Sequence, residues 1–321
     1  MSNISRRDIL TWVAASAASW THAVRAQDQT MRIIVGFPPG GTTDVLARLV
    51  ATTMGTLTGR NIIVENKPGA SGNIGAQFVA KSAPDAHTLI LVSSSHGTNA
   101  SLYKKLPFDT VADFAPIGMV ASTPYVLVVH PQVPANNVAQ LIELLKTNPN
   151  RYSYASSSVG TGQHLSGELL KKMAAVDMTH IPYKGSSAAL PDLLGGRTPI
   201  MFENLAIMQP HIRSGALRAL AITSPRRSSI LPEIPTVAES LPGFAVLGWF
   251  ALLAPAKTPP ALVAQLNSSL NEAIREPSFK KTLADLGAES MAGTPAAADD
   301  FIRQEISRWG GIIRAANISI D

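Results

Sequence analysis

The chain has 321 residues, a formal charge of +5 and no cysteine. The absence of cysteine excludes disulfides, thiolate metal sites and cysteine nucleophiles. Its length suits one large or two medium domains, and 45% hydrophobic residues can form a sizeable core. Lys and Arg are scattered and aromatic residues make up only 6%. We therefore expect no nucleic-acid binding, which needs a basic stripe with interleaved aromatics.

Residues 1–26 have the three parts of an export signal. Arg6 and Arg7 lie in a charged start, an Ala-rich apolar stretch follows, and small residues lie one and three positions before Gln27. The pattern Ser-Arg-Arg-x-Ile-Leu resembles a twin-arginine signal. A membrane anchor is the alternative, but about 12 apolar residues are too few to span a bilayer as a helix. We expect periplasmic export, by the twin-arginine or the general secretory route, and cleavage after Ala26.

Strand and helix signals alternate along the rest of the chain, which favours parallel sheets with helices on both faces. Apolar runs predict strands at 32–37, 62–64, 88–92, 125–129, 152–155, 178–181, 199–202 and 217–223. Helical spacing predicts helices at 44–54, 73–81, 138–147, 164–174, 187–194, 261–275, 279–286 and 296–315.

The two strand–helix modules predict two lobes. We expect 27–122 and 247–321 to form lobe 1, and 123–246 to form lobe 2. No Gly/Ser-rich linker separates them, and strand-like residues at 117–129 and 244–254 predict two crossover strands that act as a hinge.

The first candidate site is the loop 37–44, with the sequence Phe-Pro-Pro-Gly-Gly-Thr-Thr-Asp, between a predicted strand and helix. Gly40 and Gly41 permit positive φ and a close ligand approach. The free amides of a helix start favour an anion, and open α/β sheets bind ligands at this end of their strands. The alternative is a simple tight turn; no P-loop lysine follows.

A second Gly-rich loop, 155–164, also joins a predicted strand to a helix and could offer matching amides from the other lobe. It is a weak dinucleotide fingerprint because Leu165 occupies the third glycine position. We therefore expect no nucleotide or other cofactor.

Catalytic patterns are weak. The run 93–96 (Ser-Ser-Ser-His) lacks a Gly-x-Ser-x-Gly elbow, and the seven histidines include no His-x-x-x-His pair, so we expect no catalytic residues and no metal site. A hydrolase using Ser95 or His96 is the alternative. Glu203 and Asn204 follow a predicted strand and could face a cleft or cap the next helix.

Motifs throughout the chain resemble those of the Bug receptors, the solute-binding family of tripartite tricarboxylate transporters. They lie at 37–44, 64–75, 101–107, 113–116, 182–185, 192–196, 231–237 and 249–255. The resemblance implies a type II-like periplasmic binding fold, with two lobes of mostly parallel sheet flanked by helices and joined by two crossover strands. It also implies a non-catalytic receptor that captures an organic acid, aromatic acid or acidic amino acid between its lobes.

The resemblance implies a ligand-binding pocket at Phe37, Gly40, Gly41, Thr42, Asp44, Ser93, Ser156, Thr161, Gln163, Tyr183, Lys184 and Glu203. The family usually has Asp in place of Glu203, so we expect Glu203 to tune ligand choice. Backbone amides, rather than Lys184, are expected to hold the carboxylate. The implied partners are membrane transporter subunits or a membrane sensor, and we expect a monomer.

Overall fold

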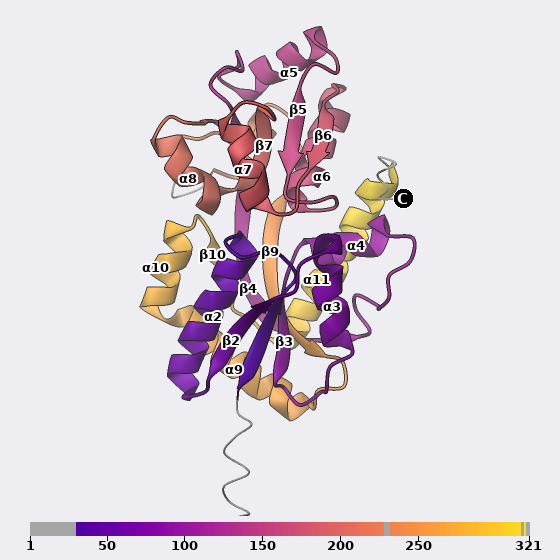
Figure 1. The fold of residues 1–321 in the computed structure, drawn as a ribbon, viewed down its shortest axis with the longest axis vertical. Coiled ribbons are helices and arrows are strands. Elements are labelled where there is room, and N and C mark those ends of the chain that lie inside the picture. The colour runs from indigo at the N-terminus through magenta and orange to yellow at the C-terminus, as the bar shows by residue number, and fades with distance from the viewer. Residues whose placement is uncertain (1–29, 228–231, 316–317, 319–321) are drawn as a thin grey trace, which may run out of the picture.

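The computed structural model describes residues 30–227, 232–315 and 318 (Figure 1). The predicted export signal at 1–26 lies outside these residues. Within the described part of the chain, no helix is both long and apolar enough to cross a membrane.

One sheet is built on three parallel strands, β1 (Met31–Val35), β2 (Ile62–Asn66) and β3 (Thr88–Ser93), in the order β2-β1-β3. Both faces of this sheet are buried. Alternate side chains of a strand point to opposite faces, so one strand contributes to an apolar cluster on each side. Ile33 and Val35 contribute to one apolar cluster, whereas Ile34 contributes to another. The accompanying helices are α2 (Thr42–Thr58), η2 (Ala70–Gly72), α3 (Asn73–Ala80), α4 (Ser95–Leu102), α9 (Pro260–Arg275), α10 (Pro277–Asp285) and α11 (Pro295–Ala315).

The second sheet contains β5 (Ser153–Ser156), β6 (Thr179–Pro182), β7 (Ile200–Asn204) and β8 (Arg218–Ile222). The strands β7-β5-β6 are parallel neighbours. Its faces are also buried on both sides, with Phe202 in one cluster and Met201 in the other. The helices here are α5 (Val138–Thr147), α6 (Gly162–Ala174), α7 (Ser186–Leu194), α8 (Leu205–Arg213) and η3 (Val237–Glu239).

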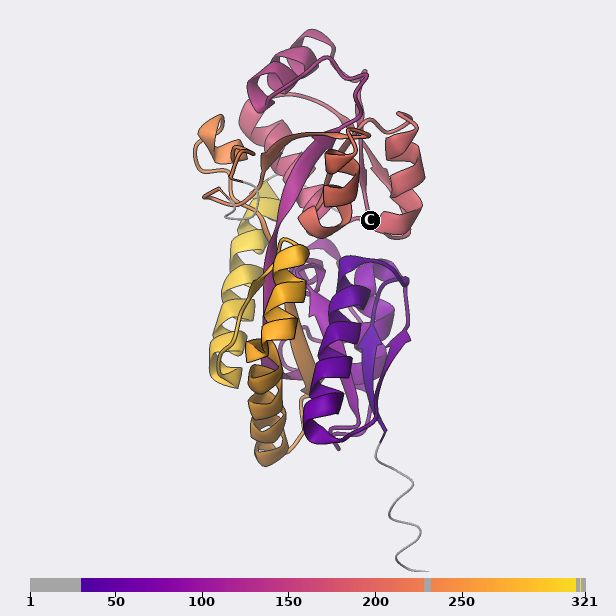
Figure 2. The same cartoon turned by 90° about the vertical axis from the view of Figure 1, so that its left-hand side faces the viewer.

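Two long strands, β4 (Phe114–Val129) and β9 (Leu247–Pro255), connect the two sheets (Figures 1 and 2). β4 pairs with β9 as far as Pro124 and with β7 from Tyr125 onward. Both pairings are antiparallel, so the parallel strands flank an antiparallel centre. A short strand, β10 (Glu289–Ser290), also pairs with β4. The predicted two-lobed α/β fold with two crossover strands is confirmed.

The C-terminal helix α11 packs along both lobes (Figure 2). Ile302 belongs to an apolar cluster of the first lobe, whereas Trp309 and Ile313 belong to a cluster of the second. The helix α11 therefore contacts both lobes on the side of the molecule where they meet.

Candidate ligand-binding site

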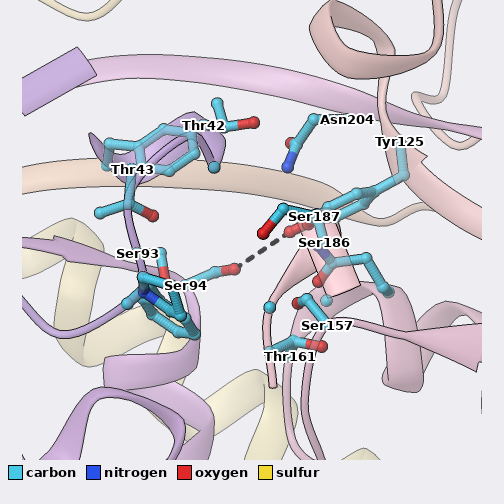
Figure 3. Close-up of a pocket in the computed structure, with 17 residues that line it drawn as sticks. Thr42, Thr43, Ser93, Ser94, Tyr125, Ser157, Thr161, Ser186, Ser187 and Asn204 are labelled. Carbon is cyan, nitrogen blue, oxygen red and sulfur yellow. Dashed lines mark hydrogen bonds between the residues drawn. The ribbon is translucent and has the colours of Figure 1, made fainter. Parts of the chain in front are cut away.

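A cavity with an empty volume of about 490 Å³, which includes space open to solvent, lies between the lobes (Figure 3). We call it the inner cavity. The residues that line it are Phe37, Pro38, Gly41, Thr42, Thr43, Ser93, Ser94, Tyr125, Ser157, Thr161, Gly162, Gln163, Gly185, Ser186, Ser187, Asn204 and Phe250. None of these described residues carries a formal charge, so an anion bound here would have to be held by dipoles and hydrogen bonds.

Four helices begin at the inner cavity. The residues that precede their first turns, Gly41 for α2, Ser94 for α4, Thr161 for α6 and Gly185 for α7, all line it. The first amides of a helix have no acceptor within the helix, and its dipole makes this end positive. The convergence of these helix starts makes an uncharged cavity favourable for an anion.

The start of α2 presents free donors to the cavity. Among the described residues, the amides of Thr42 and Thr43 have no backbone acceptor, and the buried Thr42 hydroxyl has no hydrogen-bond partner. Gly40 has the positive φ of +86°, whereas Gly41 has an extended φ of −84° that any residue can adopt. The conformational need for glycine is therefore at Gly40, which corrects the expectation that Gly41 shares it.

Asp44 holds this loop through hydrogen bonds. Its carboxylate accepts hydrogen bonds from the Gly40 amide at 3.1 Å, from Arg48 at 3.0 Å and from Asn66 at 2.9 Å. Burial raises the pKa of Asp44, but the bonds from Arg48, Gly40 and Asn66 outweigh it and hold the pKa below its usual value. Asp44 is thus an anion whose charge is already compensated, and it fixes the loop.

The start of α6 is shaped by buried polar contacts. Gly160, with φ of +79°, donates its amide to His164 Nδ1 at 3.1 Å. Ser156 Oγ lies 2.7 Å from His180 Nε2, and neither residue belongs to the cavity lining. A Cβ at Gly162 would lie only 2.2 Å from the hydroxyl of Tyr125. The close approach of α6 to Tyr125, which lies 3.3 Å from Ser94 Oγ in the first lobe, therefore requires glycine.

Glu203 is fully buried next to the cavity and holds two of its lining side chains. Its Oε1 accepts from Gln163 Nε2 at 3.1 Å and from the Asn204 amide and side chain at 2.7 and 3.0 Å. Its Oε2 has no partner among the described residues. Burial raises the pKa of Glu203, while the hydrogen bonds from Asn204 and Gln163 oppose that rise. Glu203 thus orients the amides of Gln163 and Asn204.

The lobes are also joined by hydroxyl groups. Ser71 Oγ lies 2.6 Å from the Val159 carbonyl and 2.9 Å from Ser158 Oγ, and Thr98 Oγ1 donates to the Gly160 carbonyl at 2.6 Å. These bonds connect η2 and α4 of the first lobe to the loop before α6. They describe a closed arrangement of the two lobes around the cavity.

The alternative hydrolase site lacks the required geometry. His96 Nε2 bonds to the Thr110 carbonyl at 2.9 Å, and burial lowers the pKa of His96 to about 4. The hydroxyl of Ser95 lies 2.9 Å from that of Ser93. His96 is therefore a neutral core residue between Phe108 and Phe114. Within the described residues, no group of three His, Cys, Asp or Glu could hold a metal ion.

The predicted pocket residues fall into three groups. Phe37, Gly41, Thr42, Ser93, Thr161 and Gln163 line the inner cavity. Gly40, Asp44, Ser156 and Glu203 lie outside its lining and contact residues near it, as described above. Tyr183 and Lys184 lie in an adjoining groove.

Sequence reasoning missed part of the wall, notably Ser94, Tyr125 and Ser186 as lining residues. Asn204, which was expected either to face a cleft or to cap a helix, lines the cavity. The start of α7 could have been found, because Gly185 followed by two serines opens a predicted helix. Tyr125 carried no such signal, since it begins an ordinary apolar strand.

Comparisons with known proteins identify the family of the chain. Residues 46–318 match the family described as "Tripartite tricarboxylate transporter family receptor". The chain is 39% identical over 305 residues to Protein BugT of Bordetella pertussis, covering 94% of this chain and 92% of that protein.

Two solved structures are similar over nearly their whole length. Rpa4515 of R. palustris, determined with adipate, has a TM-score of 0.88 at 35% identity, covering 91% of this chain and 98% of that one. The periplasmic binding protein BugD has a TM-score of 0.86 at 34% identity, with the same coverage. The chain belongs to the family of tripartite tricarboxylate transporter receptors, which are solute-binding proteins and not enzymes.

Proposed function

We propose that the protein captures a small carboxylate in the inner cavity and delivers it, unchanged, to a tripartite tricarboxylate transporter. The observation that carries the proposal is the convergence of four helix starts on a cavity without a charged side chain. Such a site favours an anion. The similar structure of Rpa4515 with adipate supports a carboxylate as that anion.

The energy balance supports amide recognition. Removing a carboxylate from water costs several kcal/mol if nothing compensates it. Hydrogen bonds to a charged group contribute about 1.5–3 kcal/mol each, so three or four donors are sufficient. Thr42 supplies an amide and an unpartnered hydroxyl, Thr43 a second amide, and the start of α6 further amides. The predicted pocket residues outside the cavity lining act on the ligand through this shell or through the adjoining groove.

The lobe boundaries follow the pairing of the crossover strands. We assign 27–122 and 247–321 to lobe 1 and 123–246 to lobe 2. β4 changes partner from β9 to β7 between Pro124 and Tyr125, and β9 begins at Leu247. These changes support a hinge at the proposed boundaries, although α11 also contacts the second lobe.

We place the mature protein in the periplasm as a monomer, with the membrane subunits of the transporter as its partners. Cleavage after Ala26 predicts a mature N-terminus at Gln27, which mass measurement of periplasmic protein tests. Replacement of Arg6 and Arg7 by Lys blocks export if the twin-arginine route is used. Continued export of that variant would indicate the general secretory route.

Native mass spectrometry of the purified protein tests the proposed function. We expect a co-purified small acid that is released unchanged when the protein is denatured. Recovery of a chemically altered product after incubation, or binding of sugars or cations without any acid, would contradict the proposal.

A further inference from the structure

A second, larger hollow adjoins the inner cavity and differs from it in chemistry. We call it the outer groove; its empty volume is about 750 Å³. Phe37, Pro38, Ser157 and Gly185 line both hollows, so the two share walls. The remaining groove residues are Gly36, Pro68, Gly69, Ala70, Ser71, Ser158, Tyr183 and Lys184.

The walls of the outer groove are largely apolar. The rings of Phe37, Pro38, Pro68 and Tyr183 lie along it. The hydroxyl of Tyr183 donates to Asp192 at 2.7 Å, so its polar end is already used outside the groove and its ring remains as wall. A hydrocarbon chain or ring that leaves the inner cavity would therefore lie against apolar surface.

Lys184 is the only charged residue among the described residues that line the groove. Its side chain is exposed, and the backbone on both sides of it is fixed: the Tyr183 amide donates to the Ser156 carbonyl at 2.9 Å and the Gly185 amide to the Ser157 carbonyl at 2.8 Å. None of the described residues that line the groove is a carboxylate that could neutralise it. By contrast Lys67, next to the groove residue Pro68, is paired with Glu65 at 2.6 Å.

The inner cavity and the outer groove offer different environments to the two ends of an acid with two charged groups. The inner cavity compensates one carboxylate with helix-start donors and contains no cation for a second. Two carboxylates close together in that enclosed space would repel each other. A second anionic end is more favourable in the open groove, where water and an uncompensated ammonium group are both available.

We propose that the outer groove is a second subsite, in which Lys184 faces the distal anionic group of an elongated dicarboxylic acid with an apolar spacer. This inference rests on the proposed function, because it requires the first carboxylate to occupy the inner cavity. The outer groove selects a ligand by the length of its spacer and by its second charge. The inner cavity recognises only the first carboxylate.

The test is a calorimetric titration of ligand-stripped protein with two matched series, linear α,ω-dicarboxylates and monocarboxylates of equal chain length. The variants are Lys184→Gln and Lys184→Glu, with Lys146→Gln as the control. Lys146 is another exposed lysine of the same lobe, in the last turn of α5 and outside both hollows.

We expect Lys184→Gln to weaken long dicarboxylates by about two- to fivefold, since an exposed ion pair contributes little. Lys184→Glu should weaken them further. Both variants should leave monocarboxylates and the shortest dicarboxylates unchanged, and Lys146→Gln should change nothing. The loss of dicarboxylate affinity caused by Lys184→Gln should also become smaller when the salt concentration rises from about 10 to about 300 mM, because salt screens exposed charges.

Equal losses for both ligand series would overturn the inference and make Lys184 a support of the inner site. Equal affinity of wild-type protein for each dicarboxylate and its matched monocarboxylate would also overturn it. Failure of every acid to bind the wild-type protein would instead contradict the proposed function, so the two failures are distinguishable.

Discussion

Replacing Thr42 by proline removes a single amide from the inner cavity while keeping the helix. Thr42 is the first residue of α2, a position where proline is well tolerated. The preceding Gly41 has φ of −84° and ψ of 166°, which suits a residue before proline. The chain itself begins α9, α10 and α11 with proline. We therefore expect Thr42→Pro to fold.

The loss in affinity can be separated from the loss of the hydroxyl. Thr42→Val removes the hydroxyl and keeps the amide, so the difference between the two variants reports the amide. We expect Thr42→Pro to bind an acid about 10- to 150-fold more weakly than Thr42→Val, because a hydrogen bond to a charged group contributes about 1.5–3 kcal/mol. Calorimetry measures both affinities, and thermal melting confirms that both variants fold. Equal affinities of two folded variants would refute amide recognition at this position.

Three other predictions address closure, ligand choice and acid stability. Ser71→Ala and Thr98→Val should each weaken every acid by the same factor, about two- to tenfold for a lost neutral hydrogen bond; calorimetric losses that depend on the acid would contradict a role in closure. Glu203→Asp should change the thermal-shift ranking of acids, because a shorter side chain cannot hold Gln163 and Asn204 as before; an unchanged ranking would make Glu203 purely structural. For His96, burial lowers the pKa in the folded protein to about 4, below the ordinary value of 6.5. The stability that neutral His96 provides is therefore present above pH 6.5 and lost as the pH falls toward 4. His96→Gln should reduce the pH dependence of the free energy of unfolding by urea over that range. An unchanged slope with pH would contradict the burial of a neutral His96.

Much of the fold could be predicted because its elements have clear periodicity. The helix predicted at 138–147 has the same bounds in the structure, and the crossover strands were expected from continuous apolar residues without a linker. The helix α4 was missed. Its sequence, Ser-His-Gly-Thr-Asn-Ala-Ser-Leu, has no apolar stripe, because it is buried through polar contacts such as those of Thr98 and Asn99.

The site was predictable where a motif lies on the chain that forms the wall. The loop before α2 and the loop before α6 were both expected to face the cleft, and residues of both line it. The part of the wall formed by Tyr125 depends on which strands become neighbours, and a single sequence does not encode that locally. The contact of Glu203 with Gln163 could not be predicted for the same reason, because the two residues are 40 positions apart along the chain.

We propose that the inner cavity, which has no cation among its described lining residues, binds carboxylates by their charge. The most direct measurement is calorimetry of ligand-stripped protein with acids and their uncharged amides, matched in size. We predict that acids bind and amides do not, and that an acid at 100 times its dissociation constant raises the unfolding free energy by about 2.7 kcal/mol. Binding of the amides with no binding of the acids would contradict the claim.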